Sequence, residues 1–183
     1  MEAKLKQLED QDIIEQVMGP TSWVSPLVIV DKPNGDIRLR VNMCNPNEAL
    51  RPTHHPYPTS EEILQDLNGS NTFSKIDLKE CYHQIELAES SRQLTTFRTH
   101  VGLRRYKCLP YRASVGSEIC QHVIGQVLEG CHNIRNIAED ILVYGTTQKK
   151  NDRSLENVLL RLQEKNLTFN STNCLFGVPE LGY

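Results

Sequence analysis

The stretch NIRNIAEDILVYG, residues 133–145, places two adjacent acids, Glu139 and Asp140, inside an otherwise strand-like run. The residues on either side, Asn136–Ala138 and Ile141–Tyr144, predict two strands of a tight hairpin with both acids at or beside its turn. A solvated turn tolerates acids without any functional reason. The stretch taken alone favours that interpretation.

A third acid elsewhere in the chain makes a functional role of Glu139 and Asp140 more plausible than a merely solvated turn. Asp77 lies near the end of the segment TFSKIDL, residues 72–78, which predicts a buried strand. Three carboxylates gathered at one sheet edge would repel one another unless divalent cations neutralised them, and such oxygen ligands suit Mg²⁺. Two such ions about 4 Å apart would clamp the attacking and leaving oxygens of a phosphoryl transfer. A metal site is therefore one interpretation of Asp77, Glu139 and Asp140, beside that of acids tolerated in a solvated turn.

The remaining segments indicate an α+β fold with helices on one face of an antiparallel sheet. Apolar spacing predicts a first helix that Gly19-Pro20 stops, and Asn34-Gly35 predicts the turn of a hairpin. A loop from Asn45 to Pro58 precedes a capping box, Thr59-x-x-Glu62, that begins a helix. The other predicted strands are residues 27–30, 37–41, 85–87, 94–97, 106–109 and 167–169, and the other helices are residues 117–129 and about 152–165.

Composition limits the possible location and class of the protein. The 183 residues carry a net charge of -3 and contain no apolar run near the roughly 18 residues of a membrane helix. The six cysteines show no paired spacing, so we expect reduced thiols, no zinc site and an intracellular, cytoplasmic or nuclear protein. Candidates for phosphate contacts, although such charges are more often a solvated face, are Arg92, Arg98, Arg104, Arg105 and Lys107.

Five ordered segments resemble the reverse transcriptase of gypsy-class long-terminal-repeat retrotransposons. They are SPLVIVDKPNGDIRLRVNM, FSKIDLKECYHQIEL, TTFRTHVGLRRYKCLPY, AEDILVYG and LTFNSTNCLFGVPELGY. The resemblance implies the fingers and palm of a right-hand polymerase with a split β-α-β palm, and it places thumb, ribonuclease H and integrase outside this chain. Residues 1–71 would form the N-terminal helix and fingers flap, with a palm-entry helix at 60–68. Residues 72–183 would form the palm, with an embedded fingers segment at about 86–110.

The resemblance also implies residue roles. The chain would copy an RNA or DNA template from a primer with deoxynucleoside triphosphates and Mg²⁺, for which Mn²⁺ can substitute, and no membrane partner is implied. Asp77, Glu139 and Asp140 would be catalytic residues and metal ligands. The nucleotide-binding residues would be Lys32 and Arg38 on the flap, Tyr82 as a gate against the ribose 2′-hydroxyl, and Tyr111. Without the resemblance, core packing explains Tyr82 equally well, and a solvated surface explains Lys32 and Arg38.

Several positions depart from the family pattern. Glu139 stands where the family has aspartate, and its extra methylene lengthens the arm by about 1.5 Å at a site that tolerates misplacement poorly. Arg112 and Cys81 stand where relatives carry glycine, and Cys120 stands where they carry an aromatic residue. Two hypotheses stay open. The chain is a polymerase domain of weakened activity, or it is a catalytically inactive relic that binds nucleic acid or protein.

Overall fold

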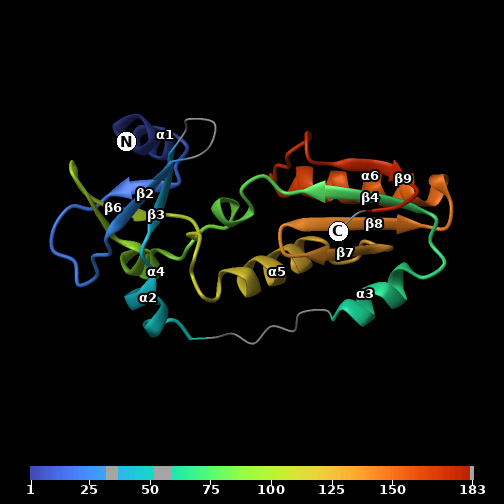
Figure 1. Ribbon diagram of the computed structural model, residues 1–183, viewed down its shortest axis with the longest axis horizontal. Helices are drawn as coiled ribbons and strands as arrows, with labels where there is room; N and C mark the ends of the chain where they lie inside the picture. Colours follow the sequence, from blue (N-terminus) through green and yellow to red (C-terminus); the bar gives the residue numbers. More distant parts are fainter. Residues whose placement is uncertain (32–36, 52–58, 182–183) are drawn as a thin grey trace. The chain divides into compact units, whose positions relative to one another are not determined.

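The chain passes three times between two structural units. The computed structural model, drawn as a ribbon in Figure 1, describes residues 1–31, 37–51 and 59–181. The first unit comprises residues 1–53 and 82–116, and the second comprises residues 54–81 and 117–183. None of the helices in the described ranges is long and apolar enough to cross a membrane.

The first unit contains two antiparallel sheets. One has the strand order β1-β6-β5, and the other is the hairpin of β2 and β3. The elements are α1 (Glu2–Asp10), β1 (Ile14–Gln16), β2 (Leu27–Asp31), β3 (Ile37–Val41), α2 (Cys44–Ala49), α4 (Glu89–Arg92), η2 (Gln93–Thr95), β5 (Phe97–Thr99), β6 (Gly102–Tyr106) and all but the first residue of η1 (Cys81–Gln84), since Cys81 belongs to the second unit. Apolar side chains of α1, β1, β5 and β6 form one core, which includes Leu5, Leu8, Ile14, Phe97 and Tyr106.

The N-terminal segment and the loop after β3 differ from the prediction. The first helix ends at Asp10, because Ile14 is buried opposite Tyr106 in the β1–β6 pair rather than on a longer helix. The loop predicted from Asn45 begins as the short helix α2, whose Pro46 lies in the first turn, where backbone N–H groups have no partner within the helix. The strands of the predicted flap are confirmed as β2 and β3, and their connecting turn lies outside the described residues.

The short strands predicted between the two helical regions are displaced. The regular strands are β5 and β6, which begin at Phe97 and Gly102. Glu86 and Cys108, from two of the predicted strands, form only an isolated bridge. Residues 89–95 are helical instead, since α4 and η2 follow one another there.

The second unit is an antiparallel four-stranded sheet with helices, as the α+β pattern predicts. Its strand order is β7-β8-β4-β9. The elements are α3 (Ser60–Leu67), β4 (Thr72–Asp77), α5 (Gly116–Val127), β7 (Ile134–Ile137), β8 (Asp140–Gly145), α6 (Gln148–Glu164) and β9 (Leu175–Val178). Helix α6 packs along β8 and β4 and lies behind them in Figure 1.

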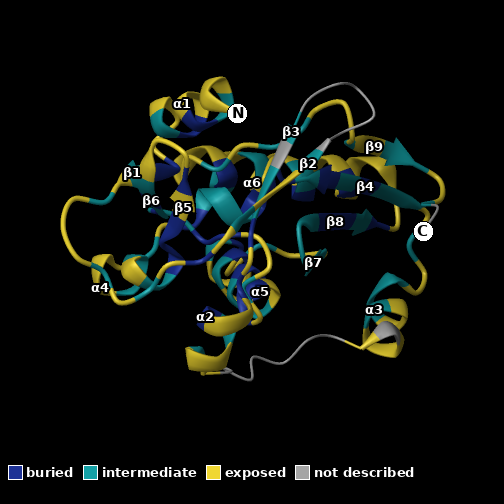
Figure 2. Ribbon diagram, turned by 60° about the vertical axis from the view of Figure 1, so that its left-hand side comes forward, coloured by how far each residue is buried: buried dark blue, intermediate teal, exposed yellow. Residues whose placement is uncertain are grey.

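Burial alternates along β4, whereas the middle of β8 is buried on both faces of the sheet. Ile76, Ile141 and Val143 are completely buried, and Figure 2 shows β8 as the most buried strand of this sheet. On the same face the buried side chain of Asn151, in α6, donates to the carbonyl oxygen of Val143 at 3.1 Å and accepts from the Ser74 hydroxyl at 2.7 Å. These bonds fix α6 on the sheet, because buried polar groups are costly unless they are paired. The opposite face carries Lys75, Asp77 and Asp140, together with the buried side chain of Leu142.

Local capping signals place the helices of the second unit. The predicted capping box is confirmed: the Glu62 amide donates to the Thr59 hydroxyl at 3.2 Å, and the Thr59 amide donates to the Glu62 carboxylate at 2.8 Å. Helix α6 begins at Gln148, earlier than predicted. The reason is Thr147, whose hydroxyl accepts the Lys150 amide and caps the helix there.

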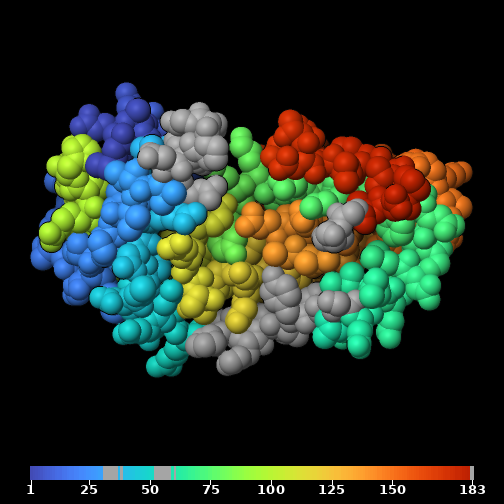
Figure 3. All heavy atoms as spheres, in the orientation of Figure 1, coloured from blue at the N-terminus to red at the C-terminus, as the bar shows by residue number. Residues whose placement is uncertain are grey.

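The last strand lies later than predicted. The backbone amide of Asn170 donates to the carbonyl oxygen of Asp77 at 2.8 Å, so residues 167–169 meet only the end of β4 and form no ladder. The ladder is made instead by β9, whose Leu175 and Phe176 remain exposed at the edge of the sheet. The residues near the C-terminus, red in Figure 3, lie on the face of the second unit that this view shows.

The boundaries of the two units differ from the predicted domain limits. Helix α3, expected as the palm-entry helix of the first 71 residues, lies in the second unit. The segment inserted into the chain of the second unit runs from Tyr82 to Gly116 rather than over about residues 86–110. The assignment of the first unit to fingers and the second to palm stays a prediction.

Candidate active site

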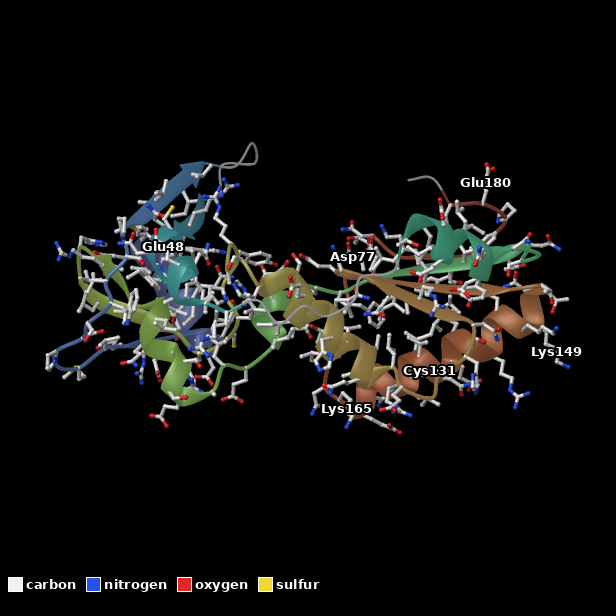
Figure 4. All side chains as sticks on the ribbon, turned by 90° about the horizontal axis from the view of Figure 1, so that it is seen from below. Glu48, Asp77, Cys131, Lys149, Lys165 and Glu180 are labelled. Carbon is white, nitrogen blue, oxygen red and sulfur yellow. The ribbon has the colours of Figure 1, made fainter. Side chains whose placement is uncertain are left out.

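Asp77 and Asp140 lie directly opposite each other where β4 ends and β8 begins. The Leu78 amide donates to the Glu139 carbonyl oxygen at 3.0 Å, which makes Asp77 and Asp140 a non-hydrogen-bonded pair of the ladder. In such a pair the side chains share one face and the Cα atoms are about 4.5 Å apart. Figure 4 labels Asp77 at the end of its strand. The fold therefore brings together two carboxylates that are 63 residues apart in the chain (140 minus 77).

Glu139 lies in the two-residue turn between β7 and β8. Ile137 and Asp140 are the last paired residues, so Ala138 and Glu139 form the turn, and Ala138 adopts a positive φ of 53°. The Glu139 carboxylate is partly buried, and its charge contributes to a raised pKa of the nearby Cys81 thiol. The predicted hairpin is confirmed, with Asp140 already in the strand and Glu139 in the turn.

The three acids do not form a closed metal cage. Within the described residues, no three side chains of His, Cys, Asp or Glu are grouped so that they could hold a metal ion. The Lys75 ammonium instead lies 2.7 Å from Oδ2 of Asp140. Two opposed carboxylates still fit a divalent cation, because Mg²⁺ at sites of this kind is bound by one or two carboxylates, water and substrate phosphates.

The side chain of Gln121, in α5, makes two hydrogen bonds that tie the helix to the end of β7 and to the turn. Its side-chain nitrogen donates to the Asn136 carbonyl oxygen at 2.9 Å, and its side-chain oxygen accepts the Ala138 amide at 3.0 Å. The Asn136 side chain returns a bond to the Gln121 carbonyl oxygen at 2.9 Å. Sequence reasoning missed this residue. The one available signal was a polar side chain on the otherwise apolar face of a predicted amphipathic helix.

Cys81 and Cys120, two of the predicted departures from the family pattern, touch each other. Their thiols are hydrogen-bonded, and both side chains are buried. The bond to Cys120, then burial, then the charges of Cys120 and Glu139 raise the pKa of the Cys81 thiol far above its ordinary value. Cys120 also donates to the Ala138 carbonyl oxygen at 3.8 Å. Two small thiols thus fill the space beside the turn.

Tyr82 and Tyr111 pack together in the first unit. Their ring centroids are 4.8 Å apart, and the ring of Tyr111 also meets His83 edge-on at 5.0 Å. Gly116 is required beside them, because a Cβ atom on it would lie 2.7 Å from Cε1 of Tyr82. The structure thus joins two of the predicted nucleotide-binding residues into one aromatic cluster. The three acids belong to the second unit.

Arg112 adopts a backbone conformation that glycine would adopt without strain. Its φ is +73°, in the left-handed region that favours glycine, and its side chain is exposed. The loop is held by Asn47, whose side chain donates to the Arg112 carbonyl oxygen at 3.0 Å and accepts the Ser114 amide at 2.9 Å. The left-handed backbone conformation that glycine adopts easily is thus present here in an arginine.

The predicted cationic residues divide into two groups. Lys32 lies outside the described residues, and Arg38 is paired with Val30 in the backbone ladder, with its side chain not described. Most of the candidates for phosphate contacts instead form ion pairs with acids: Arg92 with Glu86, Arg104 with Glu9, Arg105 with Glu15, and Lys107 with Asp12. These pairs favour a structural role for the four cations, whereas Arg98 is exposed on β5.

Comparison with known proteins agrees with this geometry. The family model described as reverse transcriptase (RNA-dependent DNA polymerase) matches residues 30–183. The chain belongs to the reverse transcriptase family. An uncharacterised protein of Caenorhabditis elegans is 26% identical to this reverse transcriptase domain over 186 residues, which cover 100% of this chain and 14% of that protein. A Tf2 transposon polyprotein of Schizosaccharomyces pombe is 28% identical over 153 residues, 82% of this chain. This chain spans only 12% of that polyprotein.

Solved structures show the same fold. The foamy viral protease-reverse transcriptase in complex with double-stranded DNA superposes with a TM-score of 0.86 at 18% identity, over 100% of this chain and 38% of that chain. The same viral protein in complex with an RNA/DNA hybrid gives 0.82 at 18% identity, over 94% of this chain and 23% of that chain. The predicted α+β fold of polymerase fingers and palm is confirmed for this reverse transcriptase domain.

Proposed function

We propose that this chain is the fingers and palm of an RNA-directed DNA polymerase from a gypsy-class long-terminal-repeat retrotransposon. The observation that carries the proposal is the opposed pair of Asp77 and Asp140, with Glu139 in the adjoining turn. Membership of the reverse transcriptase family supports it, as does the likeness to viral enzymes solved with double-stranded DNA and with an RNA/DNA hybrid.

The chain binds an RNA or DNA template with its primer, and it extends the primer with deoxynucleoside triphosphates. Asp77 and Asp140 would hold Mg²⁺, or Mn²⁺ in its place, with Glu139 as the third acid in the adjoining turn. A divalent cation held there would supply positive charge that neutralises phosphate oxygens and favours the ionised form of the attacking hydroxyl. In the chain itself, Asp77 and Asp140 orient the reacting groups because β4 and β8 fix their backbones.

The other predicted roles follow from the chemistry of the side chains. Tyr82 excludes a ribose 2′-hydroxyl, and Tyr111, whose ring packs on that of Tyr82, binds the nucleotide with it. Lys32 and Arg38 bind the triphosphate, since a point charge and a planar fork both neutralise phosphate oxygens. Arg112 hinders the nucleotide where relatives have glycine, so activity is weak.

Primer extension on an RNA template tests the proposal. The double variant Glu139→Asp with Arg112→Gly should extend about 100-fold faster than the unaltered chain, because misplacement by about 1 Å costs about that much. Asp77→Asn in the same background should abolish extension. Glu129→Asp, at an exposed position of the second unit, is the matched control and should change nothing. Extension that survives Asp77→Asn would overturn the proposed mechanism.

A second candidate function is favoured by the identity of residue 139 and by the ion pair that Asp140 forms. Glu139 replaces an aspartate, and Asp140 is paired with Lys75. These are features of a relic that binds nucleic acid without polymerising. For that candidate, an RNA/DNA hybrid labelled with a fluorophore binds the unaltered chain and the Asp77→Asn variant equally, and no variant extends a primer.

A further inference from the structure

Lys75 and the acidic pair share one face of the sheet. Residues two apart in a strand point to the same side, so Lys75 lies on the face of Asp77. Across the ladder Lys75 is opposite Leu142 and Asp77 is opposite Asp140. The Lys75 side chain runs diagonally to Asp140, where its ammonium is 2.7 Å from Oδ2. The register of β4 and β8 thus sets lysine and aspartate in contact.

The pair is shielded enough for its charges to matter. The side chains of Lys75 and Asp140 are only 26% and 24% exposed. Two carboxylates directly opposite each other repel, and the repulsion grows as water is removed from around them. The Lys75 ammonium offsets that repulsion, so the sheet face folds stably without a divalent ion.

A divalent ion and the ammonium compete for the same carboxylate. Both are attracted to Asp140, and they repel each other at short range. Tight coordination of Asp140 therefore requires Lys75 to move away. Four rotatable carbon–carbon bonds allow this movement without any change in the backbone.

We propose that Lys75 is a tethered cation that occupies Asp140 when no divalent ion is bound and is displaced by that ion, and that it thereby sets the metal affinity of the site. The inference rests on the proposed function, because it needs Asp77 and Asp140 to bind a divalent cation. Lys75 is a positioning residue in this scheme, since it acts through Asp140.

Calorimetric titration of the whole chain with Mn²⁺ tests the proposal without any polymerase assay. Lys75→Met should bind Mn²⁺ about fivefold more tightly than the unaltered chain, the size expected when a partly exposed ion pair no longer competes. Lys165→Met is the matched control. It removes the same charge from an exposed position after α6, labelled in Figure 4, and should leave the affinity within about twofold because salt screens distant charges.

A second measurement uses the unaltered side chain and does not depend on how the methionine variant folds. The nitrogen-15 signal of the Lys75 ammonium, assigned by its loss in Lys75→Arg, should shift as Mg²⁺ is added to the unaltered chain. Equal Mn²⁺ affinities in Lys75→Met and the unaltered chain, or an ammonium signal that ignores Mg²⁺, would overturn the role of Lys75. If neither chain binds Mn²⁺ and no signal moves, the proposed metal site fails as well. Binding without an effect of Lys75 leaves the proposed function standing and removes only this inference.

Discussion

The side-chain oxygen of Gln121 accepts the backbone amide of Ala138 at 3.0 Å, and so ties helix α5 to the turn that carries Glu139. Replacing Gln121 by methionine keeps the size of the side chain but leaves this amide and the Asn136 carbonyl oxygen without their partner. We expect Gln121→Met to lower the free energy of unfolding by about 2 kcal/mol, the usual cost of unpaired buried polar groups. Urea denaturation measures the loss, and the Ala138 amide should exchange its hydrogen faster.

The control for this variant lies on the same helix. Gln126 is exposed, so Gln126→Met should change the free energy of unfolding by less than about 0.5 kcal/mol. Equal stability of the two variants would show that the bonds made by Gln121 contribute nothing.

Arg112 stores backbone strain that glycine would release. Its φ of +73° costs a residue with a side chain about 1 kcal/mol relative to glycine. Since the side chain is exposed, Arg112→Gly should raise the free energy of unfolding by about 0.5 to 1 kcal/mol, as read from the thermal midpoint. Arg51→Gly, at an exposed position without a positive φ, should instead be neutral or destabilising. A destabilised Arg112→Gly would contradict the argument.

Gly145 allows β8 to approach α6 closely. A Cβ atom at this position would lie 2.7 Å from the backbone nitrogen of Asn151 and 3.1 Å from the carbonyl oxygen of Thr147, neither of which can rotate away. Gly145→Ala should therefore cost about 2 to 3 kcal/mol of stability in chemical denaturation. Gly125→Ala, in α5 with no atom near its Cβ position, should stabilise by about 0.5 to 1 kcal/mol. The prediction fails if both alanines act alike.

Tyr106 makes stability fall at alkaline pH. Burial raises the pKa of its phenol from 10.0 to about 12, so the folded chain keeps a proton that the unfolded chain loses. The stability contributed by the neutral phenol is complete below pH 10 and is lost as the pH rises toward 12, by about 2 to 3 kcal/mol in all. Tyr106→Phe has no phenol to ionise, so its urea midpoint should fall less between pH 10 and pH 12. Parallel pH profiles of the two chains would refute the assignment.

Short-range signals in the sequence predicted much of the fold. The capping box of Thr59 and Glu62, and the hairpin of the strands β7 and β8, depend on residues that are neighbours in the chain, and both are confirmed. The motif that ends at Asp77 also indicated that this acid terminates a strand. Its pairing with Asp140 followed from the resemblance rather than from spacing, because register across two distant strands is set by the whole sheet.

Longer-range contacts escaped prediction for the same reason. Ile14 has an apolar side chain that suits either a helix or a strand, and its partner Tyr106 decides in favour of the strand. Cys81 and Cys120 lie 39 residues apart in the sequence (120 minus 81), and only the fold shows that their thiols are in contact. The sequence around Lys75 gives no sign of its contact with Asp140, because the two residues meet only through the register of β4 and β8.

The ion pairs of the first unit give the protein built-in counterions. Glu9, Asp12 and Glu15, all near the N-terminus, already neutralise Arg104, Lys107 and Arg105. Cations that are satisfied inside the chain release no bound salt ions when a polyanion approaches. This surface therefore adds little to the salt dependence of nucleic-acid binding. A chain trimmed of its first helix and strand would lack these three acids, so Arg104, Lys107 and Arg105 would meet a polyanion without their present partners.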